Sequence, residues 1–219
     1  MIREQVRARI QEIGIIPGIR ASSPEDALFA AEAVASGGIP IVEVTMTVPG
    51  AIEVISHLVR NGPELIVGAG TVWDTEMARR CLDAGAMFLT STGLDIQIVE
   101  FAARENVVTF PGALTPSEVM MAWKAGADFV KVFPCSQLGG PAYIKALKAP
   151  FPQVPLIASG GVNQQNAAAF FLAGASAVGV GAHLIPKKAI ELRQPHRIQE
   201  LAVRLVNIVN SARGQRPKT

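Results

Sequence analysis

Short apolar segments rich in valine and isoleucine alternate along the chain with longer stretches whose apolar positions follow a helical period. Apolar runs of this kind are typical of parallel strands that helices cover on both faces. The segments with this pattern are residues 14–20, 39–45, 65–69, 87–90, 107–109, 129–133, 156–158 and 177–180. Eight strands separated by helices predict a (β/α)8 barrel, the TIM-barrel fold.

Proline and glycine mark the ends of the predicted helices. Proline stands at the expected first helical position at Pro24, Pro49 and Pro116, where its missing N–H has no helical partner to lose. Several predicted helices end in an Ala-Gly-Ala sequence or a close equivalent, as at 84–86 and 125–127. A repeated unit of helix, glycine stop and apolar strand is what a barrel of this type requires.

The whole chain, residues 1–219, is expected to be one barrel domain, because no linker or change of composition divides it. Residues 1–12 carry charges every few positions, which predicts an additional amphipathic helix at the N-terminus and no signal peptide. Residues 211–219 are polar, and we expect them to form a flexible tail.

Composition narrows the classes of function. Hydrophobic residues make up 49% of the chain and charged residues 17%, so much of the chain is expected to be buried, in part at subunit interfaces. The net charge of +2 and the absence of aromatic residues among the basic ones argue against a nucleic-acid partner. Residues 149–186 contain no Asp, Glu, Lys or Arg, but proline and glycine pairs interrupt them, which indicates a buried globular segment and not a membrane span.

The two cysteines, Cys81 and Cys135, are far apart in patterns that suggest no metal site and no disulfide framework. We therefore expect free thiols in a reducing compartment, and we predict a cytoplasmic protein without a metal.

Charged residues interrupt three of the predicted strands, namely Arg20, Glu43 and Lys131. An unpaired ion inside a sheet covered on both faces costs several kcal/mol, so these positions need an explanation. Strand alternation places Lys131 on the same face as Phe129 and Phe133, pointing into the barrel. Burial there disfavours the ammonium form and makes a neutral, nucleophilic amine available.

Glu43 also points into the barrel by the same alternation, so it is expected to meet Lys131 although the two are distant in sequence. A carboxylate beside such an amine can transfer protons. The pattern alone leaves a purely structural ion pair equally open.

Glycine pairs follow the last two predicted strands, where barrels of this fold often bind phosphate through backbone N–H groups. The sequence reads Ser159-Gly160-Gly161 after the seventh strand and Gly179-Val180-Gly181-Ala182-His183 at the eighth. Two such turns at the appropriate strands favour a phosphate site over simple tight turns. His183 is left without a predicted role.

From about residue 15 to residue 186 the chain resembles the keto-hydroxyglutarate and keto-deoxy-phosphogluconate aldolases. Order and spacing agree across several motifs, which together are specific although each alone is weak. The motifs are Val42-Glu43-Val44-Thr45, Gly68-Ala69-Gly70-Thr71-Val72, Phe110-Pro111-Gly112, Val130-Lys131-Val132-Phe133-Pro134, Ser159-Gly160-Gly161-Val162 and Val178-Gly179-Val180-Gly181.

This resemblance implies a class I aldolase that cleaves a 2-keto acid to pyruvate and an aldehyde, works as a homotrimer and needs no cofactor. It implies that Lys131 forms the Schiff base and that Glu43 is the general acid/base. Substrates of the family resemble 2-keto-3-deoxy-6-phosphogluconate or 4-hydroxy-2-oxoglutarate. The resemblance places Thr71 and Phe133 in the pyruvate pocket, and Ser159, Gly160, Gly161 and Gly181 at the phosphate turns.

Three positions depart from the family pattern. Thr47 stands where many members have an arginine that holds the substrate carboxylate, and Arg20 at the end of the first strand could supply the guanidinium instead. Thr92 replaces a proline at the end of the fourth strand and could alter aldehyde selectivity. Ala182 replaces a common serine, which removes a hydroxyl donor but keeps the backbone donors.

Two other classes of function fit parts of the pattern. A phosphate-binding isomerase or epimerase would need the glycine turns and an internal acid, but it would not need Lys131. A non-catalytic trimeric barrel would explain Thr47, Thr92 and Ala182, but it would not explain the intact Lys131 and Glu43.

Overall fold

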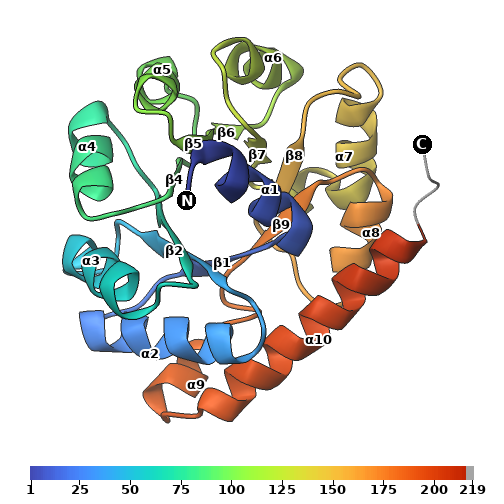
Figure 1. Ribbon diagram of the computed structural model, residues 1–219. Helices are drawn as coiled ribbons and strands as arrows, with labels where there is room; N and C mark the ends of the chain where they lie inside the picture. The colour runs from blue at the N-terminus through green and yellow to red at the C-terminus, as the bar shows by residue number, and fades with distance from the viewer. Residues whose placement is uncertain (216–219) are drawn as a thin grey trace.

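The computed structural model describes residues 1–215, and its strands form a closed barrel surrounded by helices (Figure 1). Every pair of neighbouring strands is parallel, and the order in the sheet is β5-β4-β3-β2-β1-β9-β8-β7-β6. The strands are β1 (Ile15–Ile19), β2 (Ile41–Thr45), β3 (Ile66–Gly70), β4 (Phe88–Thr90), β5 (Val108–Phe110), β6 (Gly112–Ala113), β7 (Val130–Val132), β8 (Leu156–Ser159) and β9 (Ala177–Val180).

Strands β5 and β6 are two halves of one barrel strand. Strand β5 pairs with β4 and strand β6 pairs with β7, and only Pro111 separates the halves. Proline has no N–H to donate, so it interrupts the hydrogen-bond ladder at that point. Its carbonyl still accepts a hydrogen bond from the backbone N–H of Lys131, at 2.9 Å. The nine segments therefore occupy the eight strand positions of a (β/α)8 barrel, which confirms the predicted fold class.

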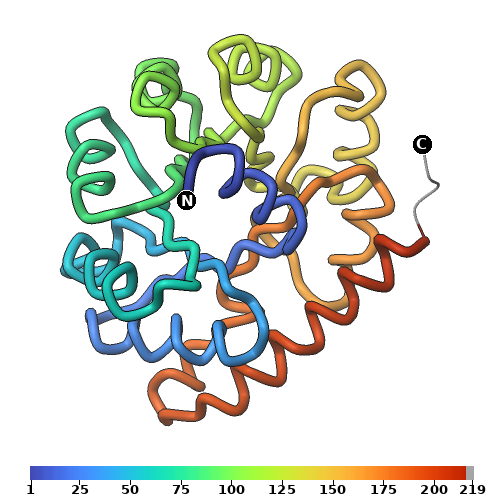
Figure 2. The backbone as a smooth tube through the Cα atoms, in the orientation of Figure 1, coloured from blue at the N-terminus to red at the C-terminus, as the bar shows by residue number. Residues whose placement is uncertain are grey.

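All helices except the first surround the sheet, and the tube through the backbone shows them as an outer ring (Figure 2). A short 3-10 helix, η1 (Ser136–Leu138), lies directly after β7 and is followed by α7. The helices are α1 (Arg3–Ile13), α2 (Pro24–Ser36), α3 (Ala51–Asn61), α4 (Thr75–Asp83), α5 (Ile96–Arg104), α6 (Pro116–Lys124), α7 (Gly140–Lys148), α8 (Ala167–Leu172), α9 (Lys187–Glu191) and α10 (Pro195–Gly214).

Two of the three helix starts predicted from proline are confirmed. Helices α2 and α6 begin at Pro24 and Pro116. The prediction at Pro49 was wrong, because α3 begins two residues later at Ala51. A turn that continues from β2 and the left-handed backbone of Gly50, with φ of 65°, delay the helix.

Helix α1 closes the N-terminal end of the barrel. Its buried residues Val6 and Ile10 join the apolar cluster inside the barrel, together with Ile16, Ile41 and other inward-facing strand residues. An ion pair of 3.0 Å between Arg3 and Asp128, which stands just before β7, ties the helix to this end. Figure 1 shows α1 lying across the opening. Only the opposite end, where the strands end, is left for a site.

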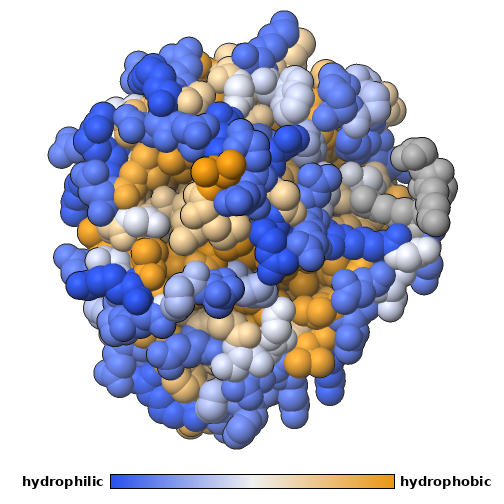
Figure 3. All heavy atoms as spheres, viewed as in Figure 1, coloured by the Kyte–Doolittle hydropathy of each residue, from blue (hydrophilic) through white to orange (hydrophobic). Residues whose placement is uncertain are grey.

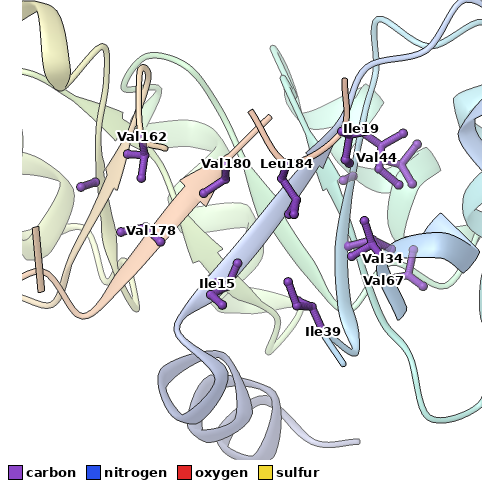
Figure 4. Close-up of a cluster of buried hydrophobic side chains, with 14 of the residues drawn as sticks. Ile15, Ile19, Val34, Ile39, Val44, Val67, Val162, Val178, Val180 and Leu184 are labelled. Atoms are coloured by element: carbon purple, nitrogen blue, oxygen red, sulfur yellow. The ribbon is translucent and has the colours of Figure 1, made fainter. Parts of the chain in front are cut away.

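A second and larger apolar core fills the space between the sheet and the helices. Figure 4 shows part of it around β1, where the outward-facing Ile15 and Ile19 lie near residues of β9 and β2. Outside this layer the helices carry mostly hydrophilic residues, with apolar residues visible in the gaps between them on the face seen in Figure 3.

The C-terminal helix continues further than the sequence suggested. Residues 211–214, expected to begin a flexible tail, are the last turn of α10. The reason is that Ala212 is buried and extends the apolar stripe of Leu205 and Val209 at helical spacing. The rest of the predicted tail, residues 216–219, lies outside the described residues. In the described part of the chain, no helix combines the length and the apolar character needed to cross a membrane.

Candidate active site

Lys131 points into the barrel from the middle of β7, as strand alternation predicted. Its neighbour two positions earlier, Phe129, belongs to the interior cluster, whereas Val130 and Val132 belong to the outer core. The lysine side chain is only 4% exposed, and its Nζ lies 5.7 Å from the centre of the Phe133 ring. The amine is therefore largely buried, with an aromatic ring on one side.

Glu43 enters the same space from β2, and it is buried to nearly the same extent as Lys131. Its Oε1 lies 3.8 Å from Lys131 Nζ. This separation allows strong electrostatic attraction but exceeds a direct hydrogen bond, so a water molecule or a substrate oxygen can interact with both groups. The two strand charges of opposite sign thus form one buried pair at the open end of the barrel.

The position of Glu43 depends on a glycine that sequence reasoning did not single out. A Cβ on Gly70, at the end of β3, would overlap with the carboxylate of Glu43. The adjacent strand therefore needs a residue without a side chain at position 70. The available signal was a glycine directly after the predicted strand 65–69, because a glycine in or beside a strand often marks the close approach of another group.

A cavity of about 310 Å³ opens beside the buried pair and extends over the ends of β7, β8, β9 and β1. It brings together most of the residues predicted for the site. These are Arg20, Glu43, Lys131, Phe133, Ser159, Gly160, Gly161, Gly181 and Ala182.

The glycine pair after β8 is a turn that other residues could not form. Gly160 and Gly161 have φ of 86° and 79°, in the region that favours glycine. A Cβ on Gly160 would meet the backbone of Pro134, and a Cβ on Gly161 would meet Ser136. The turn can therefore present its backbone to a ligand at close range, as an anion-binding loop does.

The hydroxyl of Ser136 lies behind this turn. Its Oγ is buried and has no hydrogen-bond partner among residues 1–215, while its backbone N–H donates to the carbonyl of Gly160. Ser136 packs against the turn from behind and does not line the cavity.

Three predicted site residues do not line the cavity, namely Thr47, Thr71 and Thr92. The hydroxyl of Thr47 lies 2.8 Å from that of Thr45, which donates to the carbonyl of Ile19, so Thr47 is the donor in this pair. Thr45 thus links the ends of β1 and β2, and Thr47 hydrogen-bonds to the hydroxyl that makes this link.

Thr71 and Thr92 follow β3 and β4. Thr71 is half-buried and has a left-handed backbone with φ of 60°, a conformation that costs a β-branched residue energy and is found mainly at functional positions. Thr92 is exposed, and its backbone packs so closely on Gly112 that no side chain would fit there.

Two polar cavity residues had no predicted role. Gln137 lies on η1, and His183 follows the turn at Gly181. Both side chains are exposed at the rim. The sequence marks neither as unusual, because polar residues in loops are common. Within residues 1–215 no cluster of three or more His, Cys, Asp or Glu side chains could hold a metal ion.

Comparison with known proteins yields one family and several close folds. The family model described as "KDPG and KHG aldolase" matches residues 6–201; KDPG is 2-keto-3-deoxy-6-phosphogluconate and KHG is keto-hydroxyglutarate. The chain is 32% identical to the 2-dehydro-3-deoxy-phosphogluconate aldolase of Pseudomonas aeruginosa over 204 residues, which cover 91% of this chain and 92% of the relative.

Solved structures of similar sequence share the fold. The KDPG aldolase of Legionella pneumophila, with pyruvate captured as a covalent carbinolamine intermediate, has a TM-score of 0.85 and 32% identity, covering 92% of this chain and 98% of that one. A designed protein cage made by fusing symmetric oligomeric domains has a TM-score of 0.85 and 29% identity, covering 93% of this chain and 74% of that one.

Proposed function

Since the chain belongs to the family of KDPG and KHG aldolases, a family of lyases, we propose that it cleaves a 2-keto acid to pyruvate and an aldehyde through a Schiff base on Lys131. The observation that carries this proposal is the buried pair of Lys131 and Glu43, 3.8 Å apart at the wall of an open cavity. The covalent pyruvate intermediate named for the Legionella relative supports it.

The first half of the reaction uses the amine of Lys131 as a nucleophile. The amine adds to the C2 carbonyl of the keto acid and forms a carbinolamine, which loses water to give a protonated imine. The imine attracts electrons from the neighbouring bonds and so prepares the C3–C4 bond for cleavage.

The second half needs a base, and Glu43 is placed to act as one. Glu43, directly or through a water molecule, takes the proton of the C4 hydroxyl while the C3–C4 bond breaks. The aldehyde leaves, and the bonding electrons move through C3 and C2 to the imine nitrogen, giving an enamine. Protonation of C3 gives the imine of pyruvate, and water hydrolyses it to release pyruvate and free Lys131.

The remaining residues divide between the two halves of the substrate. Phe133, which lies beside Lys131 Nζ, is proposed to contact the pyruvate half. Thr71 does not line the cavity, but it follows Gly70 beside Glu43, and we propose that bound pyruvate reaches it. Ser159 and the turns at Gly160, Gly161 and Gly181 are proposed to receive a phosphate on the aldehyde half. The chemistry needs no cofactor.

The departures from the family pattern affect substrate choice. Ala182 provides no hydroxyl, so we propose weaker phosphate binding than in relatives with serine, and KHG-like substrates stay as candidates beside KDPG-like ones. Thr47 and Thr92 lie outside the cavity, and we propose that they act on selectivity only where a longer aldehyde extends toward β2 and β4.

The other functions considered from the sequence explain less. An isomerase or epimerase would not need a buried lysine beside the acid, and a scaffold protein would not need the buried pair and its cavity. We also propose a homotrimer in the cytoplasm. An oligomer is supported by the similarity to the designed cage, and a reducing compartment is supported by two buried free cysteines.

A coupled assay that measures pyruvate release tests the proposed activity. We expect turnover of KDPG, of KHG or of both, and loss of at least about a thousandfold in kcat for Lys131→Ala, since the nucleophile is removed. The control is Lys145→Ala, which removes an exposed lysine of α7 and should leave the activity unchanged. Full turnover by Lys131→Ala would contradict the proposal.

A further inference from the structure

We propose that Arg20 binds the phosphate of the aldehyde half of the substrate and not the carboxylate of its pyruvate half. The inference rests on the proposed aldolase function, and it reassigns the guanidinium that sequence reasoning connected with the missing arginine at Thr47. Arg20 follows β1, where inward-facing positions alternate as Ile16, Gly18 and Arg20.

The direction of the Arg20 side chain is the first observation. Its Nη1 lies 3.3 Å from the position that a Cβ would take on Gly181, and 3.8 Å from the corresponding position on Gly18. The guanidinium therefore extends along the β9 side of the cavity, beside one of the proposed phosphate turns. In the sheet β1 lies between β2 and β9, so the side chain points away from Thr47 at the end of β2.

The absence of an acidic partner for Arg20 within residues 1–215 is the second observation. Two acids lie beside it in a neighbouring surface pocket, but each is paired with another cation. Asp26 lies 3.1 Å from Arg193, and Glu191 lies 3.5 Å from Lys187. Arg20 is thus not a rim residue that balances a surface acid, and its charge is available to a ligand.

The balance of charges in the cavity is the third observation. Lys131 and Glu43 compensate each other, which leaves Arg20 as the uncompensated guanidinium or ammonium group among the described cavity residues. The glycine turns and Ala182 offer only neutral donors to a phosphate. A guanidinium forms charge-assisted, two-pronged hydrogen bonds with phosphate, so Arg20 supplies what the lost hydroxyl at position 182 cannot.

Steady-state kinetics in the direction of aldol synthesis separate the two possible roles. Pyruvate is combined either with glyceraldehyde 3-phosphate or with glyceraldehyde, using wild type, Arg20→Gln and Lys188→Gln. The last variant removes one exposed positive charge of α9 that lies outside the cavity. We expect Arg20→Gln to raise KM for the phosphorylated aldehyde about ten- to hundredfold, the usual effect of losing a charge-assisted hydrogen bond.

In the same experiment KM for pyruvate and the kinetics with glyceraldehyde should stay within about twofold of wild type for Arg20→Gln, and Lys188→Gln should match wild type throughout. Arg20→Lys should recover part of the wild-type KM for glyceraldehyde 3-phosphate, because lysine keeps the positive charge but loses one of the two hydrogen bonds that the guanidinium makes to the phosphate. An equal loss with both aldehydes, accompanied by a higher KM for pyruvate, would overturn the proposal in favour of a carboxylate clamp. Unchanged KM for glyceraldehyde 3-phosphate would also overturn it.

Calorimetric titration with inorganic phosphate tests the same site without catalysis. Wild type and Lys188→Gln should bind phosphate with equal affinity, and Arg20→Gln about tenfold or more weakly. Equal affinity in all three proteins, or no binding by wild type, would overturn the proposal about Arg20. Failure of wild type to form a pyruvate adduct would overturn the aldolase mechanism instead, so the two failures are distinguishable.

Discussion

The carboxylate of Glu43 lies against Gly70, where a Cβ would overlap with it, so the space for this carboxylate depends on the missing side chain at position 70. In this position the Oε1 atom of Glu43 lies 3.8 Å from the Nζ atom of Lys131. Gly68 earlier in the same strand has a different neighbour, the ring of Phe88 in the apolar interior. One strand thus provides two glycines with separate consequences, one for the site and one for packing.

Gly70→Ala should displace Glu43 and lower kcat by about a hundredfold, the typical effect of moving a catalytic group by about 1 Å. Gly68→Ala is the matched control, because its methyl group would crowd Phe88 and not Glu43. Both variants should lose about 1–3 kcal/mol of stability through overpacking. Urea unfolding and turnover measured on both proteins check this, and equal kcat values would contradict a positioning role for Gly70.

Glu43→Gln should keep the shape of the site and remove its base. We expect kcat to fall by about 10²- to 10⁴-fold, the usual contribution of general acid–base catalysis. Incubation with pyruvate to equilibrium should still allow a Schiff base at Lys131, because the nucleophile is intact. The control is Glu100→Gln on the exposed side of α5, which should behave as wild type. Undiminished turnover by Glu43→Gln would assign the base to another group.

The start of helix α6 should make stability depend on pH. The pKa of Glu118 is lowered because the backbone N–H groups of Thr115 and Leu114 and the Thr115 hydroxyl donate to its carboxylate. Because the pKa of Glu118 is lower in the folded state, its ionised carboxylate stabilises the fold fully above pH 4.5, the ordinary glutamate pKa. This stabilisation is lost as the pH falls through the lowered pKa of the folded state.

Glu118→Gln should therefore unfold at a lower urea concentration than wild type at pH 7. The difference between the two unfolding midpoints should become smaller when the pH falls below the ordinary glutamate pKa. Thr115→Ala, which removes the other half of this capping box, should cost about 1 kcal/mol. A gap between wild type and Glu118→Gln that stays constant from pH 7 to acid would be inconsistent with the pKa shift.

Both thiols should be almost unreactive in the folded protein. Burial raises the pKa of Cys135 to about 12 and that of Cys81 to about 11, although Arg80 partly opposes the latter shift. Because the thiolate is the reactive form, alkylation by iodoacetamide at pH 8 should be at least about a hundredfold slower than for a free thiol. Both should react rapidly in urea, and rapid labelling of either thiol under native conditions would be the contrary result.

Strand alternation was sufficient to predict the centre of the site. A charged residue in an otherwise apolar parallel strand has few stable environments, so Lys131 and Glu43 could be placed on the inner face without coordinates. The glycine turn at Gly160 and Gly161 was equally readable, because its left-handed backbone excludes most other residues.

The other features of the fold and the site depended on three-dimensional geometry that a single sequence does not show. Glu43 pairs with Gly68 and Thr45 pairs with Gly70 between β2 and β3, so it is the direction of the Glu43 side chain that brings its carboxylate against Gly70. The direction of the long Arg20 side chain likewise decides that its guanidinium lies beside Gly181. Thr47 looked like a candidate for the substrate pocket, but its hydroxyl interacts with Thr45. The interruption of one strand at Pro111 was missed because two residues are too few to form a pattern.

Trapping of the covalent intermediate tests the central claim most directly. The protein is incubated with pyruvate, reduced with borohydride, digested and mapped by mass spectrometry, with Lys131→Ala treated in parallel. The mechanism predicts a reduced pyruvate adduct on Lys131 in the wild-type protein and no adduct in the variant. An unmodified wild-type protein, or an adduct on a different lysine, would contradict the assignment of Lys131 as the Schiff-base residue.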